Sequence, residues 1–318
     1  MPLSCLETYR KETFSSISHV LETYYASKNQ ITRIRQKSSD LRHIVQIALE
    51  RARKKYDLQI KQLDDTKDRE KYKVYGELIH TYGYGLEPHA RTLEALNYYT
   101  NEMVRIPLDP SKSALENAKR YFEKYNKQKR THEALSKLTQ DTKEDIEYLE
   151  SVSTALDIAL SEEDLAQIKE ELIHSGYMRR KFTKKKEKIK SRPFHYLSSD
   201  GFHIYVGKNN LQNDWLTFEF AVGNDWWFHA KNTPGSHVVV RTNGEELPDR
   251  TFEEAGKLAA YYSKARGGEK VEIDYIEKKH VKKPNGAKPG FVVYYTNYSL
   301  IIDSDISNLK EISDQTSN

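Results

Sequence analysis

Cysteine and long apolar runs are scarce in this sequence, and each shortage excludes a class of protein. One cysteine, Cys5, is present among 318 residues, so no disulfide forms within the chain and a reducing compartment is expected. No apolar run approaches the roughly 18 residues that span a membrane. The start, MPLSCLETYR, lacks a basic segment followed by an apolar core, so no secretory signal is predicted. We therefore expect a cytoplasmic protein without a membrane span, with a cell-surface location as the alternative.

Sequence motifs of catalysis and nucleotide binding are also absent. None of the glycines fits GxGxxG or GxxxxGK[ST], and Ser236, in PGSHV, lacks the surroundings of a nucleophile elbow. His229 and His237 are eight residues apart, without a Cys or a carboxylate pair to complete a zinc set. A site made only of histidines, with His203 from another expected strand, is the alternative. We expect no catalytic residue, no metal and no cofactor, and a binding protein rather than an enzyme.

Two long helices dominate the first half of the chain. Charged residues make up 31% and hydrophobic ones 37%, a balance typical of elongated or helix-rich proteins. Residues 28–82 predict one helix, which Gly83 and Gly85 end. Its seam, spaced by fours and threes, consists of Leu41, Val45, Ala48 and Ala52, and continues less cleanly through Tyr56, Ile60 and Leu63.

A second helix is expected from near Ser113 to Ala159, after a break at Pro107 and Pro110. Its seam consists of Leu135, Leu138, Thr142, Asp145, Leu149, Val152, Leu156 and Ala159. The short connection between the helices favours an antiparallel hairpin, with an intermolecular coiled coil as the competing interpretation. Residues 93–106 alternate like two short strands that turn near Thr100 and Asn101, which predicts a small element at the hairpin tip.

A short helix and a basic run follow the hairpin. Ser161 is the expected N-cap of a helix over 161–178. Residues 179–192 then contain nine Lys or Arg residues against one Glu, Glu187. We interpret this run as a linker in which Lys184, Lys185 and Lys186 contact phosphates, although a solvated linker without a binding role is the alternative. Residues 1–27, with an apolar stripe at helical spacing, are expected to end a preceding domain.

The last third of the sequence predicts a small sheet domain. Its expected strands include 202–206, 225–231, 238–240, 271–276 and 291–295, with a helix over 251–264 that Thr251 begins. Trp226 and Trp227 are adjacent and point to opposite faces of a strand, so one should fill the core. The fold class is therefore α+β: a long antiparallel coiled-coil hairpin followed by a small domain with a mostly antiparallel sheet.

Six motifs in this region carry a family resemblance. They are VGKNNLQND, DWWFHAK, GSHVV, YYSKA, DYIEKKHVKK and GAKPG, in that order between residues 206 and 290. Together they resemble the NFACT-R domain of the NFACT family. Bacterial members of that family are described as RqcH ribosome quality-control factors and as fibronectin-binding proteins of the FbpA and PavA type. Ile276 stands where the family pattern suggests Thr, and 295–303 is only loosely similar, so the resemblance rests on the six motifs and not on the last strand.

The resemblance implies a domain plan and a role. The plan is the end of a missing N-terminal domain at 1–27, a coiled-coil hairpin at 28–178 with a tip at about 86–110, a basic linker at 179–192, an NFACT-R-like domain at 193–312 and a disordered tail at 313–318. The implied role is binding to the large ribosomal subunit, both rRNA and the stalk base through the tip, together with tRNA, in support of alanine tailing of stalled nascent chains. A surface adhesin for fibronectin or fibrinogen is the alternative.

Basic and polar side chains of the sheet domain are the candidate RNA contacts. Lysines interleaved with aromatic residues suit unpaired RNA, where bases stack and phosphates need cations. A soluble sheet with a lysine-rich loop is the alternative. The expected RNA-binding residues are Lys208, Asn209, Asn210, Asp214, Trp226, His229, Lys231, Ser236, His237, Lys264, Lys278, Lys279, Lys282, Lys283 and Lys288.

Overall fold

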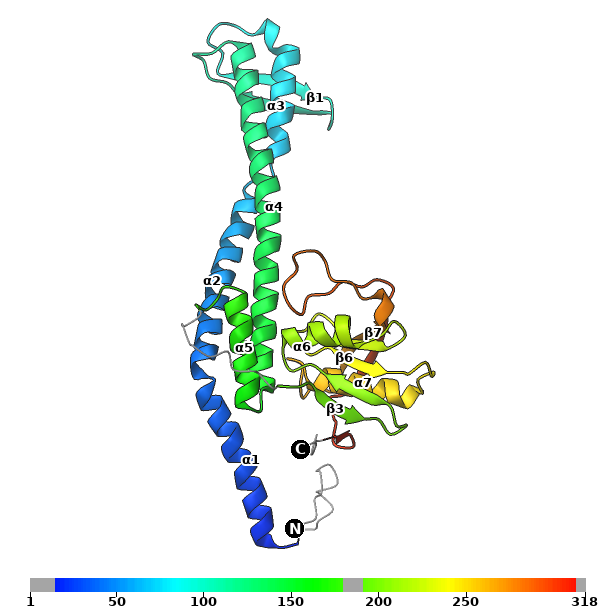
Figure 1. Ribbon diagram of the computed structural model, residues 1–318. Coiled ribbons are helices and arrows are strands. Elements are labelled where there is room, and N and C mark those ends of the chain that lie inside the picture. Colours follow the sequence, from blue (N-terminus) through cyan, green and yellow to red (C-terminus); the bar gives the residue numbers. More distant parts are fainter. Residues whose placement is uncertain (1–14, 180–190, 313–318) are drawn as a thin grey trace, which may run out of the picture. The chain divides into compact units, whose positions relative to one another are not determined.

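The computed structural model describes residues 15–179 and 191–312, which fold into two compact units (Figure 1). One unit combines the residues up to Leu49 with those from Glu147 onward, and the other is Glu50–Ile146. Cys5, Lys184, Lys185 and Lys186 and the expected tail at 313–318 lie outside the described residues. Within the described ranges, no helix has the length and apolar character needed to cross a membrane.

The helices that precede the sheet in the first unit include α1 (Ile17–Lys37), the start of α2 (Ser39–Asp64), the end of α4 (Ala114–Ile158) and α5 (Glu162–His174). Gln30 donates to the carbonyl of Leu160 at 3.1 Å, and Arg42 donates to the carbonyl of Leu156 at 2.6 Å. The residue number of the acceptor falls as that of the donor rises, so the two segments run antiparallel. The predicted seam residues that become buried here include Leu41, Val45, Leu149, Val152 and Leu156. The apolar stripe of α1 is exposed instead, with Ile17 80% accessible.

The single helix predicted over 28–82 is wrong, because the chain breaks it twice, between α1 and α2 and between α2 and α3 (Arg69–Tyr82). At the first break the buried Ser38 hydroxyl donates to the carbonyl of Arg35 and accepts from Arg42 Nε. At the second break the Thr66 hydroxyl donates to the carbonyl of Leu63 at 2.6 Å and contacts His132 Nδ1 at 2.8 Å. Short hydroxyl side chains compete with the helical ladder in this way, and heptad spacing does not reveal it.

The second unit contains α3, a 3₁₀ turn η2 (Gly83–Gly85), and two antiparallel strands, β1 (Thr92–Asn97) and β2 (Glu102–Pro107). The turn between them includes Asn101 at φ 58°, as the predicted tip requires. The core of this unit consists of Leu78, Ile79, Leu93, Ala95, Ile106 and Ala118. Leu138, predicted to lie in the seam, is 47% exposed, so that prediction is wrong.

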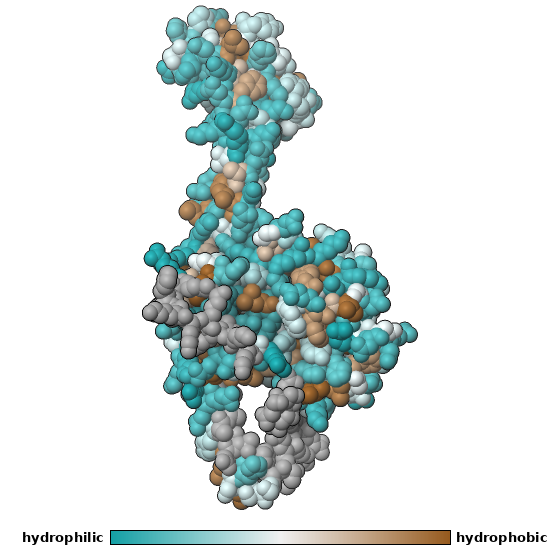
Figure 2. All heavy atoms as spheres, in the orientation of Figure 1, coloured by the Kyte–Doolittle hydropathy of each residue, from teal (hydrophilic) through white to brown (hydrophobic). Residues whose placement is uncertain are grey.

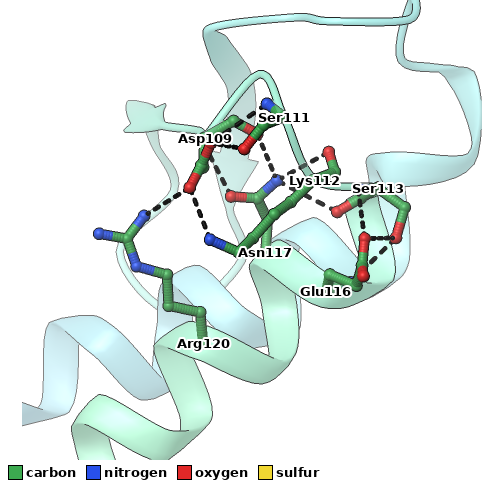
Figure 3. A network of polar contacts seen from close by, with 7 residues as sticks. All are labelled: Asp109, Ser111, Lys112, Ser113, Glu116, Asn117 and Arg120. Atoms are coloured by element: carbon green, nitrogen blue, oxygen red, sulfur yellow. Dashed lines mark hydrogen bonds and ion pairs between the residues drawn. The ribbon is translucent and has the colours of Figure 1, made fainter.

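A polar network fixes the start of α4 (Figure 3). Ser113 and Glu116 form a reciprocal cap, in which Glu116 Oε2 accepts from the Ser113 backbone N–H at 2.8 Å. The buried Asn117 accepts from the backbone N–H of Asp109 at 2.8 Å and donates to three carbonyl groups of the same loop. Lys112 and Ser111 hold the pKa of the Asp109 carboxyl well below its usual range through hydrogen bonds. These contacts satisfy backbone groups that the helix end leaves open.

In the described part of the chain, seven strands form one antiparallel sheet in the order β8-β7-β5-β6-β4-β3-β9. The strands are β3 (Phe194–Leu197), β4 (His203–Val206), β5 (Trp226–Ala230), β6 (Val238–Arg241), β7 (Val271–Glu277), β8 (Tyr298–Ile302) and β9 (Lys310–Glu311). Helix α7 (Asp249–Tyr261) packs on one face around Phe228, Ala255 and Leu258. On the other face lie α6 (Asn210–Trp215) and the π-helical turn η3 (Leu216–Phe220), around Trp227 and Val239.

The α+β class with its antiparallel helices and sheet is confirmed, but three details of the sheet domain differ from the expectation. The last long strand lies at β8 and not at 291–295, where only an isolated bridge joins Val293 to Lys282. Helix α7 begins at Asp249, and the Thr251 hydroxyl bonds to Asp200 and Ser198 rather than acting as the N-cap. Strands β3 and β9 are additional. The visible surface is mostly hydrophilic with separate apolar patches (Figure 2).

Candidate nucleic-acid interface

The lysine loop, residues 278–290, follows β7 on the sheet face that also carries α6. It begins with a 3₁₀ turn, η4 (Lys278–His280), and is anchored by the buried Val281. Lys282 then pairs with Val293 through two backbone hydrogen bonds of 2.9 and 2.8 Å. Lys279 forms an ion pair with Glu277 at 2.5 Å. Lys278 and Lys282 have no ion-pair partner among the residues that the structure describes.

Helix α6 holds the other end of this loop. Asp214 accepts a hydrogen bond from the backbone N–H of Gly290 at 3.0 Å and forms an ion pair with Lys283. Gly290 has φ +79°, and a Cβ atom there would lie 2.3 Å from Asn210 Oδ1. Only glycine tolerates this positive φ with the Asn210 side chain so close to its Cα. The motifs VGKNNLQND and GAKPG, about 75 residues apart, therefore meet at this point.

The motif VGKNNLQND also joins the sheet domain to α5. The Lys208 ammonium nitrogen lies 3.5 Å from Oδ1 of the buried Asp164, and the Asn209 side chain donates to Gln167 Oε1 at 2.7 Å. Asn210 donates to Glu171 Oε1 at 2.8 Å and to the Ser151 hydroxyl at 2.7 Å. Asn209 and Asn210 are buried. Their polar groups are thus occupied within the protein, and RNA binding through them stays a prediction.

Glu171 is a buried carboxyl group in this junction. Burial raises its pKa to about 7, against the opposing effect of hydrogen bonds from Asn210 and Tyr148. Beside it, the Lys288 ammonium lies 4.9 Å from the centre of the Tyr148 ring and donates to the Tyr177 hydroxyl at 3.2 Å. Burial also raises the pKa of the Tyr148 hydroxyl. Lys288 therefore ties the lysine loop to the helices and is not a fully available cation.

His229, Ser236 and His237 lie at the ends of β5 and β6. His237 is buried and its Nδ1 lies 2.8 Å from the Thr217 hydroxyl. Burial lowers the pKa of His229 to about 4 and lowers that of His237 well below its ordinary value. The Ser236 backbone N–H donates to the carbonyl of Tyr262 at 2.9 Å. These histidines are neutral at physiological pH and are hydrogen-bonded inside the domain. Among the described residues, no group of three or more metal-ligating side chains occurs.

The remaining candidates are not part of the lysine loop. Trp226 packs on the α7 side, with its ring 4.8 Å from that of Phe252, while Trp227 is fully buried on the opposite side. Lys231 forms a 2.7 Å ion pair with Glu272, and Lys264 lies 3.6 Å from Glu150. The structure thus gathers five predicted lysines in one loop: Lys278, Lys279, Lys282, Lys283 and Lys288.

The sequence-based prediction missed the acidic and amide partners on α5, namely Asp164, Gln167 and Glu171. They lie more than 35 residues before the motif that they contact. Asp164 lies in the first turn of α5. It also completes the capping box with Ser161, the predicted N-cap. No periodicity links such distant residues, and only their contacts in the fold show the pairing.

Comparison with known proteins gives two adjacent family matches. Residues 1–191 match the NFACT N-terminal and middle domains, and residues 192–295 match the NFACT protein RNA binding domain. The chain is 41% identical over 300 residues to the Rqc2 homolog RqcH of Streptococcus suis, covering 94% of this chain and 54% of that protein. It is 38% identical over 303 residues to the Rqc2 homolog RqcH of Bacillus subtilis, covering 92% and 52%.

A solved structure shares the fold. It is the C-terminal part of the fibronectin/fibrinogen-binding protein from Streptococcus suis, with 38% identity and a TM-score of 0.68. The match covers 86% of this chain and 96% of that one. The chain spans about half the length of the curated relatives that it matches. Two consecutive domain matches and this identity over nearly the whole chain show that it belongs to the NFACT family.

Proposed function

We propose that this chain is the RNA-binding part of a ribosome quality-control factor, acting as a binding module and not as an enzyme. In this role it contacts the large ribosomal subunit in the cytoplasm, together with tRNA, and supports alanine tailing of stalled nascent chains. The family membership and the names of the RqcH relatives support the assignment to ribosome quality control. The tailing activity itself is proposed for the longer protein, since the relatives are about twice as long.

The observation that carries RNA binding is the lysine loop. Its backbone is held at both ends, by the Lys282–Val293 bridge and by the Gly290–Asp214 hydrogen bond, while Lys282 is exposed. Lys278 and Lys282 keep an uncompensated charge in the described part of the chain. A fixed backbone carrying available ammonium groups suits phosphate contact, which needs cations and little sequence information.

The test is co-sedimentation of the chain with purified large ribosomal subunits over a range of salt concentrations. Lys282→Glu should weaken binding. It should also reduce the steepness of the plot of log affinity against log salt concentration, lowering the magnitude of its slope by roughly one. Lys270→Glu, an equal charge change at an exposed lysine just before β7, should leave the plot near that of the unmodified chain. Equal effects from both variants would assign binding to overall charge and would refute a role for the loop.

A second function is favoured by the name of the structural relative, which binds fibronectin or fibrinogen. Here the chain acts as an adhesin at the cell surface, through the same basic loop or another face. Immobilised fibronectin and fibrinogen would distinguish the two functions. Binding that resists moderate salt and survives Lys282→Glu, with no sedimentation on ribosomal subunits, would favour the adhesin.

A further inference from the structure

On the sheet face opposite α7, the side chains of β3, β4 and β9 can be followed through the strand register. Cross-strand partners share a face in an antiparallel sheet. Lys310 pairs with Leu197, Leu197 with His203, and His203 with Arg241, so these four lie in one row on that face. In the next row His195 pairs with Tyr205. The alternate residues Phe194 and Tyr196 belong to the α7 core.

Aromatic rings continue across this face to α6. The rings of His195 and Tyr205 are stacked, with centroids 4.4 Å apart and planes 7° apart. Tyr205 meets Phe220 edge to face at 4.7 Å, and Phe220 lies 5.0 Å from Trp215. His203 adds a further ring, since its Nδ1 lies 2.8 Å from His195 Nε2. We call these five side chains the aromatic row: His203, His195, Tyr205, Phe220 and Trp215.

The aromatic row is accessible at both ends and partly open between them. Trp215 is 41% exposed although it is the largest side-chain type, and His203 is exposed. Tyr205, Phe220 and His195 are half-buried. A folded domain normally buries such rings, as it does Trp227 next to them. Unpaired bases stack on solvent-exposed ring faces, which this row offers at Trp215 and His203.

Charges around the aromatic row suit a polyanion. Arg241 lies over the Phe220 ring at 4.8 Å and forms a 3.0 Å ion pair with the buried Asp225, so that carboxylate is neutralised. Asp214, next to Trp215, is neutralised by Lys283. Glu219, next to Phe220 in the sequence, is an exposed carboxylate beside the row.

Two lysines supply the cations at the ends of the row. Lys282 follows Val281, which packs in the same cluster as Phe220. Lys310 occupies the strand row of His203.

We propose that the aromatic row is a stacking platform for single-stranded RNA, with phosphates held at Lys282 and Lys310. This rests on the proposed RNA-binding function and names the surface that takes the bases. The platform gives a role to the exposed rings of Trp215 and His203 at the two ends of the row. Duplex RNA, whose bases are already stacked, satisfies only the lysines.

Tryptophan fluorescence tests the platform directly. The chain has three tryptophans: Trp215, Trp226 and Trp227. Titration with an oligouridylate of about eight nucleotides, within the usual span of single-strand sites, should quench the fluorescence. Trp215→Phe should remove the quenching while binding persists, because a phenyl ring still stacks. Trp226→Phe, on the α7 side, should keep the quenching. Quenching that survives Trp215→Phe would overturn the proposal.

Affinity measurements separate base stacking from charge. Trp215→Ala and His203→Ala should each weaken oligouridylate binding, by about fivefold to a hundredfold for Trp215, and should barely change binding of an abasic oligomer of equal length. His80→Ala, at an exposed histidine of α3 outside both the aromatic row and the lysine loop, is the control. Abasic and normal oligomers that bind equally, with sensitivity to Lys282→Glu alone, would refute the platform and leave the proposed function standing. If no RNA binds in a salt-dependent way, the proposed function fails as well.

Discussion

Replacement of the buried Glu171 by glutamine should change how stability depends on pH. In the folded chain the carboxyl group is fully buried with a pKa of about 7, against an ordinary value of 4.5. Between about pH 4.5 and pH 7, Glu171 therefore keeps a proton in the folded state that it has lost in the unfolded state. Stability from this group is therefore complete below pH 4.5, falls as the pH rises, and is lost above pH 7.

The size of the effect follows from the separation of the two pKa values. Each unit of difference between the two pKa values corresponds to roughly 1.4 kcal/mol of folding free energy, so the free energy of unfolding falls by roughly 3 kcal/mol in all. Glutamine keeps the acceptor for Asn210, which donates at 2.8 Å, and carries no charge to desolvate. The variant should therefore lack this fall and be more stable than the unmodified chain at pH 8.

Urea unfolding at pH 5 and pH 8, followed by tryptophan fluorescence, measures the difference. All three tryptophans lie between residues 215 and 227, in the domain that Glu171 contacts through Asn210. Glu163→Gln, at an exposed position on the same helix, is the matched control and should retain the unmodified pH dependence within about 0.5 kcal/mol. Equal pH dependence in Glu171→Gln and the unmodified chain would refute the assignment of a raised pKa to this carboxyl group.

Three further substitutions test other contacts, each by urea or thermal unfolding. Gly290→Ala should lower the free energy of unfolding by roughly 1–3 kcal/mol, because its Cβ meets Asn210, whereas Gly286→Ala, with a similar φ and open space, should cost less. Leu149→Ala should cost about 2–5 kcal/mol because its side chain is buried, and Leu138→Ala, on the same helix but exposed, should cost under about 1 kcal/mol. Asn117→Ala should cost about 1–3 kcal/mol by removing the hydrogen bonds in Figure 3, while Asn126→Ala, an exposed change on α4, should be near neutral. Similar costs within any of these pairs would contradict the corresponding contact.

Periodicity predicted the parts of the fold that depend on local pattern. The tip hairpin, the Ser161 cap and the long α4 each follow from residues close together in the chain. The breaks at Ser38 and Thr66 were missed because a single hydroxyl competes with the helical ladder without disturbing the apolar spacing. Strand β9 is two residues long and exists only through its pairing with β3, so no window of sequence indicates it.

The candidate site was predicted less completely than the fold. Five of the predicted lysines do share one loop, because they are neighbours in sequence. The expected aromatic contribution of Trp226 does not join them, since its ring packs towards α7. The rings of Trp215, Phe220 and Tyr205 lie together through sheet register and the π-helical turn, which composition does not reveal.

The polar motif VGKNNLQND shows why a family motif and a binding surface need not coincide. Its Asn209, Asn210 and Asn213 are buried, and each bonds to another part of the chain: Gln167, Glu171 and the His237 backbone. A buried amide must find such partners or cost free energy, so their identity is constrained by folding alone. Folding does not require Lys282 or Trp215 at an exposed position. Water satisfies the lysine wherever it lies on the surface, and exposure of a large aromatic ring is unfavourable. Exposed groups that folding does not require are thus the better candidates for recognition, and here they are a lysine loop and an aromatic row on one face of the sheet.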